Sequence, residues 1–147
     1  YYAFDTFSGF PDGVKEDNWF KSRDREVFSC FSVAYIKNQL KEAKVSEEII
    51  NSINFREGLF SKTFKNYSGN PGFVFIDVDL YESYKDCLEF FYPKLVKNGV
   101  ILLDEYDTKN HLKKWPGAKL AIDEFAEKHK IEIMRLWTGA TYIQKLS

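Results

Sequence analysis

The chain has 147 residues, 44% of them hydrophobic, which is enough to bury one ordinary core, and we expect a single domain over residues 1–147. Its 21 Lys and Arg residues nearly balance its 22 Asp and Glu residues, so neither nucleic acid nor an anionic membrane surface is an expected partner. No apolar run approaches the ~20 residues that a membrane-spanning helix needs.

The N-terminal half predicts two strands and two helices. Residues 1–5 have the pattern of a strand, and the glycines and proline of residues 7–17 predict a loop. Apolar side chains recur at helical spacing over residues 27–43. A serine followed by two glutamates favours a short helix over residues 46–52, and a strand is expected over residues 53–56.

The C-terminal half continues the alternation of strands and helices. Strands are expected over residues 73–77 and 100–103, and helices over residues 84–96 and 119–130, the last after a loop that includes Pro116 and Gly117. A hairpin closes the chain, with strands over residues 131–137 and 140–144. This order predicts an α/β fold with a mostly parallel sheet and a C-terminal antiparallel hairpin.

Acidic residues follow two of the predicted strands directly. Asp77 and Asp79 come after one strand, and Asp104 and Glu105 come after the next, with a helix-length segment between them. Parallel neighbouring strands lie about 5 Å apart, and open α/β sheets bind ligands at the carboxyl ends of their strands. We therefore expect these carboxylates to meet and to be able to hold one hard cation.

Four short motifs occur in order along the chain: DTFSGFP at residues 5–11, GLF at 58–60 with Thr63, DVDLYES at 77–83, and DEY at 104–106. Together they resemble the macrocin O-methyltransferase (TylF-like) family over essentially the whole chain. The resemblance implies a Rossmann-like class I methyltransferase fold and an enzyme that uses S-adenosylmethionine and a divalent cation. The implied reaction transfers a methyl group to a hydroxyl, typically of a sugar in an antibiotic or another glycoside.

The resemblance also implies roles for the acidic residues. Asp79 would be the catalytic base that takes the hydroxyl proton. Asp77, Asp104 and Glu105 would hold the metal, with Mg²⁺ the most plausible ion because ligands that are all oxygen favour a hard cation over zinc. As an alternative, Asp79 caps the following helix and Asp104 and Glu105 form a solvated turn.

A second group of residues would bind the cofactor, namely Asp5, Ser8, Gly58, Phe60 and Asp77. Asp5 would accept hydrogen bonds from the ribose hydroxyls, although an Asx-turn is the alternative for an aspartate in this place. Gly58 and Phe60 would border the adenine, because glycine permits close backbone approach and an aromatic ring offers a flat apolar face. A turn glycine and a core phenylalanine are equally compatible with the sequence.

The chain departs from the family pattern in three places. Nothing precedes Tyr1, where the family has a central first strand and a glycine-rich turn, so we expect an N-terminally incomplete domain with a gap beside strand four in the order 3-2-1-4-5-7-6. The second acid pair is Asp104-Glu105 where the family usually has two aspartates. Tyr84 stands where threonine is common, a difference expected to matter little.

Two other functions stay open. Without the first strand, the chain would be a non-catalytic truncated module that binds a partner instead of a cofactor. An Asp-x-Asp motif after a strand also occurs in haloacid-dehalogenase-like phosphatases, with Asp77 as nucleophile and Asp79 as acid and base. That scheme also needs a strand ending in Ser or Thr and a lysine, and the 27 residues from Asp77 to Asp104 leave no room for them.

The remaining expectations concern location and partners. Cys30 and Cys87 stand alone, without a CxxC pair or a secretory leader, which favours reduced thiols in a cytoplasmic protein. The expected partner is a small-molecule hydroxyl acceptor, which His111 is a candidate to approach, and a homo-oligomer stays open.

Overall fold

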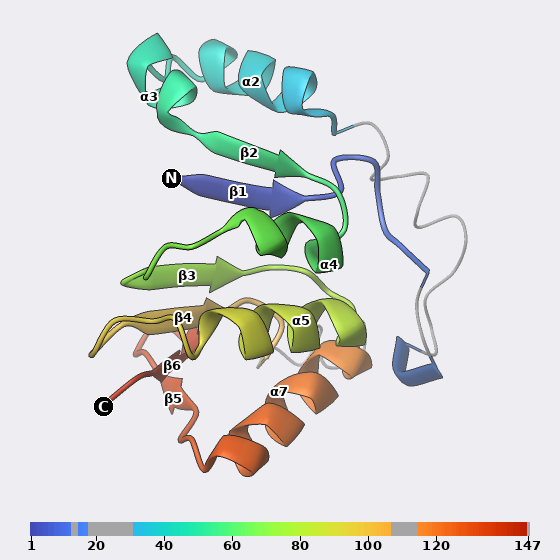
Figure 1. The fold of residues 1–147 in the computed structure, drawn as a ribbon, viewed down its shortest axis with the longest axis vertical. Helices are drawn as coiled ribbons and strands as arrows, with labels where there is room; N and C mark the ends of the chain where they lie inside the picture. Colours follow the sequence, from blue (N-terminus) through green and yellow to red (C-terminus); the bar gives the residue numbers. More distant parts are fainter. Residues whose placement is uncertain (13–14, 18–30, 107–114, 147) are drawn as a thin grey trace. The chain divides into compact units, whose positions relative to one another are not determined.

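The computed structural model describes residues 1–12, 15–17, 31–106 and 115–146, which fall into two compact units (Figure 1). The first unit comprises Tyr1–Asp12 and Phe20–Tyr67, and the second comprises Gly13–Trp19 and Ser68–Ser147. A single domain over residues 1–147 therefore stays a prediction.

The first unit is built on two parallel strands. Its elements are β1 (Tyr2–Asp5), α2 (Val33–Glu42), α3 (Glu47–Ser52), β2 (Asn54–Glu57), α4 (Phe60–Thr63) and the 3-10 turn η2 (Phe64–Asn66). Asp5 is opposite Glu57 in the register of β1 and β2. The first two helices begin where serines cap them, since the Ser32 and Ser46 hydroxyls accept hydrogen bonds from backbone N–H groups three residues on.

The second unit holds a four-stranded sheet in the order β3-β4-β6-β5. Its elements are η1 (Lys15–Asp17), β3 (Phe73–Ile76), α5 (Tyr81–Phe91), β4 (Val100–Leu103), α7 (Pro116–His129), β5 (Met134–Arg135) and β6 (Thr141–Gln144). Strands β3 and β4 are parallel, and β6 is antiparallel to both β4 and β5. The predicted α/β fold with a parallel core and a C-terminal hairpin is confirmed.

The strand orders also agree with the order expected for the class I methyltransferase fold. The pair β2-β1 gives the 3-2 part of that order, and β3-β4-β6-β5 gives the 4-5-7-6 part. Within the described residues, β1 pairs only with β2 and β3 only with β4. The described strands thus form two sheets and not one continuous sheet.

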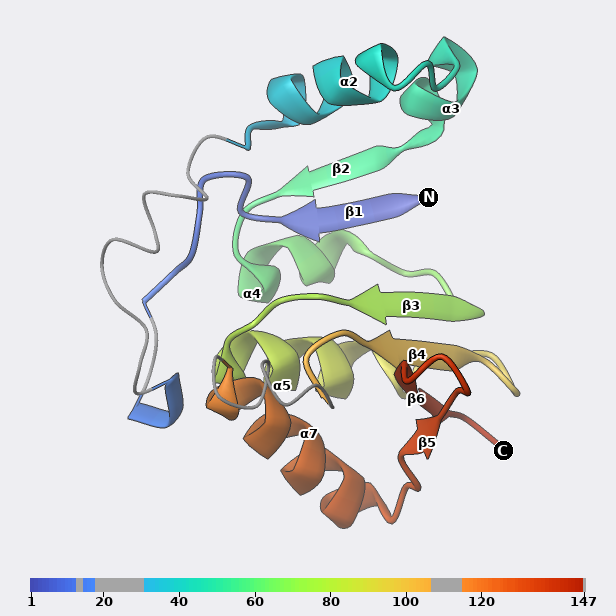
Figure 2. The same cartoon turned by 180° about the vertical axis from the view of Figure 1, so that it is seen from behind.

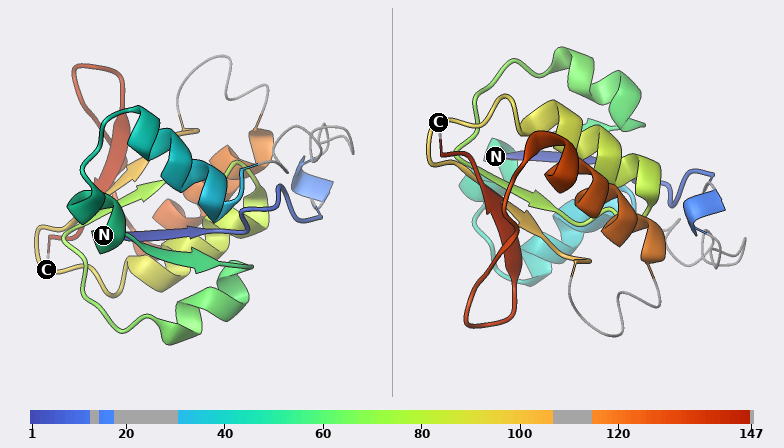
Figure 3. Two further views of the ribbon diagram at one scale, coloured as in Figure 1. Left: turned by 90° about the horizontal axis from the view of Figure 1, so that it is seen from above. Right: turned by 90° about the horizontal axis from the view of Figure 1, so that it is seen from below.

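The core of the second unit lies between its sheet and two helices. Alternate residues of β4, Ile101 and Leu103, are buried, while Val100 and Leu102 on the other face are only partly covered. Helices α5 and α7 pack along each other on one face of the sheet. Figures 1 and 2 show this arrangement from front and back, and Figure 3 shows it from above and below. The core residues of the helices recur at spacings of three and four, as expected for an amphipathic helix: Tyr84, Leu88 and Phe91 on α5, and Ala118, Ala121, Ile122 and Phe125 on α7.

The helix boundaries differ from the predicted ones. Helix α5 begins three residues before the predicted start at residue 84 and ends at Phe91, short of the predicted 96, because Pro93 has no N–H to continue the helix. Helix α7 begins at Pro116, which was predicted to lie in a loop, because proline fits the first turn, where N–H groups have no partner within the helix. Helix α2 begins at Val33 and not at residue 27, and residues 27–30 lie outside the described residues.

Among the described helices, none combines the length and the apolar character needed to cross a bilayer.

Candidate active site

The parallel pairing of β3 and β4 brings the two acidic segments to one edge of the sheet. Ile76 is opposite Leu103 at the ends of the two strands, so the residues that follow leave the sheet side by side. The Asp104 N–H donates a hydrogen bond of 3.1 Å to the Ile76 carbonyl, which extends the ladder by one residue. The segments that carry the carboxylates are therefore fixed by backbone hydrogen bonds.

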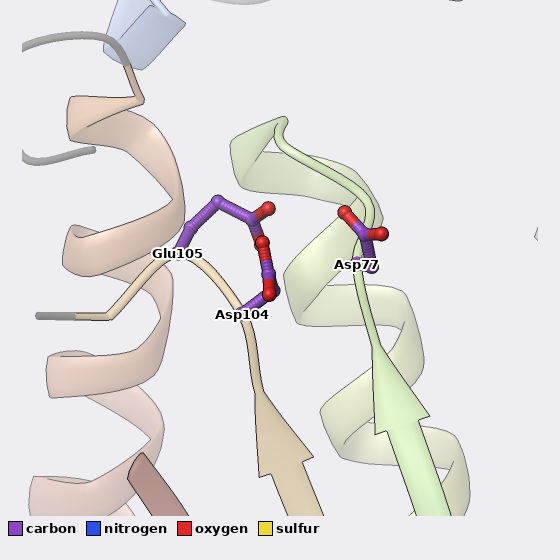
Figure 4. Close-up of side chains that lie close together, drawn as sticks. All are labelled: Asp77, Asp104 and Glu105. Carbon is purple, nitrogen blue, oxygen red and sulfur yellow. The ribbon is translucent and has the colours of Figure 1, made fainter. Parts of the chain in front are cut away.

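Three carboxylates meet at this edge. Asp77, Asp104 and Glu105 each offer one oxygen, and these oxygens lie within 4.8 Å of one another. Figure 4 shows Asp104 and Glu105 together after β4, with Asp77 at the end of β3. Asp77 and Asp104 are exposed to solvent, whereas Glu105 is buried. The expected convergence of the acidic residues is present, while their role as metal ligands stays a prediction.

Glu105 is the unusual member of the group, because its side chain is only 1% exposed. The hydroxyl of Tyr84, itself fully buried, forms a short hydrogen bond with Oε2 of Glu105. The Glu105 N–H donates a second hydrogen bond, of 3.3 Å, to the same hydroxyl. Both the backbone and the carboxyl group of Glu105 are therefore held by one tyrosine.

Burial raises the pKa of the Glu105 carboxyl to about 9. The Tyr84 hydrogen bond opposes this shift, while the negative charges of Asp79, Asp77 and Asp104 add to it. The neighbouring negative charges disfavour ionisation of the buried Glu105 carboxyl, and a bound positive charge would reduce this repulsion. The site therefore has the electrostatic character of a cation-binding site.

Asp79 lies two residues beyond Asp77 and has a left-handed backbone conformation, with φ of 61°. Such a conformation is uncommon for a residue with a side chain, although aspartate and asparagine adopt it more readily than most. Uncommon backbone conformations cluster at functional sites, where the surrounding structure holds them. Asp79 is half-buried and close enough to Glu105 for its charge to act on the Glu105 pKa, so it belongs to the same acidic site.

The three carboxylates fit a hard divalent cation. All of the donor atoms are oxygens, which suits Mg²⁺, Ca²⁺ or Mn²⁺ better than a softer ion. The three oxygens lie within 4.8 Å of one another, so one ion placed among them would be near all three.

The predicted cofactor residues of the first unit lie at the carboxyl ends of β1 and β2. The Gly58 N–H donates a hydrogen bond of 2.9 Å to the Asp5 carbonyl, so these two residues are adjacent. Gly58 has φ of 131°, a conformation that a residue with a side chain rarely adopts, and this explains glycine at that position. Ser8 follows in the exposed loop after β1.

Two of these residues also have the ordinary roles considered from the sequence. Asp5 forms an Asx-turn, in which its Oδ1 accepts a hydrogen bond of 2.7 Å from the Phe7 N–H. Phe60 stacks on Phe64, with ring centroids 4.9 Å apart and planes 6° from parallel. An exposed carboxylate has further acceptor positions, so the Asx-turn is compatible with a bound ribose. The cofactor roles of Asp5, Ser8, Gly58, Phe60 and Asp77 stay predictions.

Sequence reasoning missed two residues that shape the acidic site. Tyr84 was noted only as a difference from the family pattern, although its spacing from Leu88 and Phe91 places a hydroxyl on the buried face of α5, in the turn beside the strand ends. Asp17 was read as a loop residue, yet it is only 5% exposed, and its Oδ1 accepts a 3.0 Å hydrogen bond from the Tyr81 N–H at the start of α5. No local pattern identifies Asp17, because its partner lies far along the chain.

Three other residues considered from the sequence fall outside the site or outside the described residues. Cys87 is a buried free thiol in α5, and burial raises its pKa well above the ordinary value. Cys30 and His111 lie outside the residues that the structure describes.

The fold is that of class I O-methyltransferases. The O-methyltransferase NovP has a solved structure that matches 99% of this chain and 60% of its own length, with a TM-score of 0.78 and 24% identity. The calicheamicin methyltransferase CalS11 matches 97% of this chain and 59% of its own length, with a TM-score of 0.72 and 26% identity. The predicted class I methyltransferase fold is confirmed.

The family model of the macrocin-O-methyltransferases (TylF) matches residues 1–145, and the chain belongs to this family. Demethyldecarbamoylnovobiocin O-methyltransferase of Streptomyces niveus is 27% identical over 146 residues, which are 96% of this chain and 53% of that enzyme. The chain thus spans about half the length of the curated relative that it matches.

Proposed function

We propose that this chain takes part in the transfer of a methyl group from S-adenosylmethionine to a hydroxyl of a sugar or glycosylated natural product, assisted by a divalent cation. The observation that carries the proposal is the group of Asp77, Asp104 and Glu105 at the ends of two parallel strands, in a chain of the macrocin-O-methyltransferase family. The names of two relatives support the class of acceptor, since one is a demethyldecarbamoylnovobiocin O-methyltransferase and the other, CalS11, is a TDP-rhamnose 3'-O-methyltransferase of calicheamicin biosynthesis.

The acidic site explains how the acceptor would be prepared. A sugar hydroxyl is a poor nucleophile at neutral pH, and a bound divalent cation lowers the pKa of a coordinated hydroxyl and fixes its oxygen. Asp77, Asp104 and Glu105 would hold that cation, and Mg²⁺ is the ion proposed. Asp79 would accept the hydroxyl proton while the acceptor oxygen forms its bond to the methyl carbon and the carbon–sulfur bond breaks.

The residues at the ends of β1 and β2 would hold the cofactor. The Asp5 carboxylate would accept hydrogen bonds from the ribose hydroxyls, with Ser8 in the same loop. Gly58 would allow the adenine to approach the backbone, and Phe60 would offer an apolar face beside it. Asp77 is proposed to contact the cofactor in addition to its place in the metal centre.

The replacement Asp79→Asn tests the assignment of the base. Asparagine is nearly the same size and also adopts a left-handed backbone conformation, so we expect an intact fold. Turnover should fall by about 10²–10⁴-fold, the usual contribution of a general base, with little change in the affinity for Mg²⁺. Asp104→Asn should weaken both turnover and Mg²⁺ affinity, and Asp86→Asn, an exposed aspartate on α5, should change neither.

Methyl transfer to the acceptor is measured with labelled S-adenosylmethionine, and Mg²⁺ binding is measured by calorimetry. An Asp79→Asn variant that turns over at the wild-type rate would show that another group takes the proton.

A non-catalytic module that binds a partner stays the alternative to a methyltransferase. Titration with S-adenosylhomocysteine separates the two functions, since a methyltransferase should bind it and a partner-binding module should not. The phosphatase alternative is disfavoured by membership of the methyltransferase family. Hydrolysis of a generic phosphate ester by this chain would support the phosphatase alternative.

A further inference from the structure

Tyr84 connects the two strand ends that carry the acidic residues. It lies in the first turn of α5, its side chain is 0% exposed, and its Oη is 3.1 Å from the carbonyl oxygen of Ile76, the last residue of β3. The same Oη is 3.3 Å from the backbone nitrogen of Glu105 and forms a short hydrogen bond with the Glu105 carboxyl group. One buried hydroxyl therefore contacts both the end of β3 and the segment after β4.

The hydrogen-bonding capacity of a phenol limits how these contacts are made. The Glu105 N–H can only donate, so Tyr84 Oη accepts that bond. When a bound cation ionises Glu105, the single hydroxyl hydrogen goes to its carboxylate, because a charged acceptor forms the stronger bond, and the Ile76 carbonyl is the second acceptor within reach. Tyr84 thus holds Glu105 at two points, one on the backbone and one on the side chain.

This arrangement suits a ligand that must be held in place. Glutamate has three rotatable side-chain bonds, and a carboxylate bonded through Oε2 keeps Oε1 as an acceptor for an ion. Groups that hydrogen-bond to metal ligands orient them, and their removal typically lowers metal affinity about 10–100-fold. The hydroxyls of the other tyrosines near the helices have different partners, since Tyr81 bonds Glu124 at 2.6 Å.

We propose that Tyr84 is a positioning residue for the metal centre, which orients the Glu105 carboxylate toward the oxygens of Asp77 and Asp104. This inference rests on the proposed function, because it assumes that these three carboxylates hold a divalent cation. Tyr84 itself does not touch the ion or the substrate in this role.

The test measures Mn²⁺ affinity of the whole chain, from the electron paramagnetic resonance signal of free Mn²⁺. Tyr84→Phe should raise the dissociation constant about tenfold or more, since it removes only the hydroxyl. Tyr81→Phe is the matched control, because it removes a tyrosine hydroxyl from the same helix at a site away from the ligands, and it should stay within about twofold of wild type. In a Glu105→Gln background, Tyr84→Phe should have no further effect, because Tyr84 acts through Glu105.

The possible failures are distinguishable. A wild-type chain that binds Mn²⁺ and a Tyr84→Phe variant that binds it equally well would overturn the role of Tyr84 and leave the metal centre standing. An equal loss in the Glu105→Gln background would also overturn it, because Tyr84 would then act through another group. A wild-type chain that binds no Mn²⁺ would overturn the metal centre and this inference together.

A second measurement covers the case in which Tyr84→Phe does not fold. A 3-fluorotyrosine is placed at position 84 in the otherwise native chain, and its ¹⁹F resonance is followed during titration with diamagnetic Mg²⁺. We expect the resonance at position 84 to move in step with saturation of the site, and a 3-fluorotyrosine at position 81 to stay unchanged. An unmoved resonance at position 84 on saturation would overturn the proposal.

Discussion

Glu105 should give up a proton when a divalent cation binds, and this coupling can be measured. Burial raises the pKa of its carboxyl to about 9, so at pH 7 about 99% of the groups are protonated. A carboxyl group must be ionised to ligate a metal. The structure therefore predicts release of about one proton per bound cation at pH 7.

The same linkage sets the pH dependence of the affinity. While Glu105 is mostly protonated, each unit of pH changes the apparent affinity for Mg²⁺ or Mn²⁺ by about tenfold, or about 1.4 kcal/mol. Between pH 6 and pH 8 the dissociation constant should thus fall by about a factor of one hundred. Glu105→Gln cannot release this proton, so its affinity should be lower and nearly independent of pH over the same range.

Titration calorimetry in two buffers with different heats of ionisation measures the proton release directly. The difference in observed heat between the buffers gives the number of protons released, and Asp86→Asn serves as a control that keeps the acidic site intact. Wild-type binding with no proton release, or a release that persists in Glu105→Gln, would refute the reasoning from burial and charge.

Two further predictions concern stability. Without divalent cations, the raised pKa of Glu105 contributes stability that is fully present below its ordinary pKa of 4.5 and is lost progressively as the pH rises toward about 9. Urea denaturation of the wild type between pH 6 and pH 8 should therefore show the free energy of unfolding falling by up to about 1.4 kcal/mol per pH unit. Glu105→Gln should show a flatter profile over the same range. Gly117→Ala should destabilise the second unit by about 1–3 kcal/mol despite the better helix propensity of alanine, because its Cβ would collide with Oδ1 of Asp17 and lie 3.0 Å from the Cβ of Tyr81. In an Asp17→Ala background the same replacement should cost clearly less, because only the 3.0 Å approach to Tyr81 remains, and an equal loss there would show that the collision with Asp17 is not the cause.

Of the strands of the second unit, β5 (Met134–Arg135) is much shorter than the predicted strand over residues 131–137. Strands β3 and β4 follow closely from the sequence, because short apolar runs that end in acidic residues identify both the strand and its carboxyl end. The first and last residues of β3 and β4 match their predicted positions to within one residue. The pairing of these strands explains why Asp77, Asp104 and Glu105 meet. This part of the site can be predicted from the local sequence, because the carboxylates directly follow each strand.

The parts that sequence reasoning missed depend on contacts between distant residues. The start of α5 is fixed by Asp17, which lies 64 positions before Tyr81. The burial of Glu105 depends on Tyr84, 21 positions before it. A pattern read along the chain gives the period of a helix, whereas these two contacts appear only when the segments are brought together.

The Asp17 contact also has a consequence for how the second unit can be obtained alone. This unit is discontinuous along the chain, since residues 13–19 belong to it while the segments on either side belong to the first unit. A fragment that starts at Ser68 would lack the buried carboxylate that caps α5, and Leu80 at the cap position offers no side-chain acceptor in its place. Truncation at that apparent boundary would therefore leave the helix beneath the acidic site without its anchor.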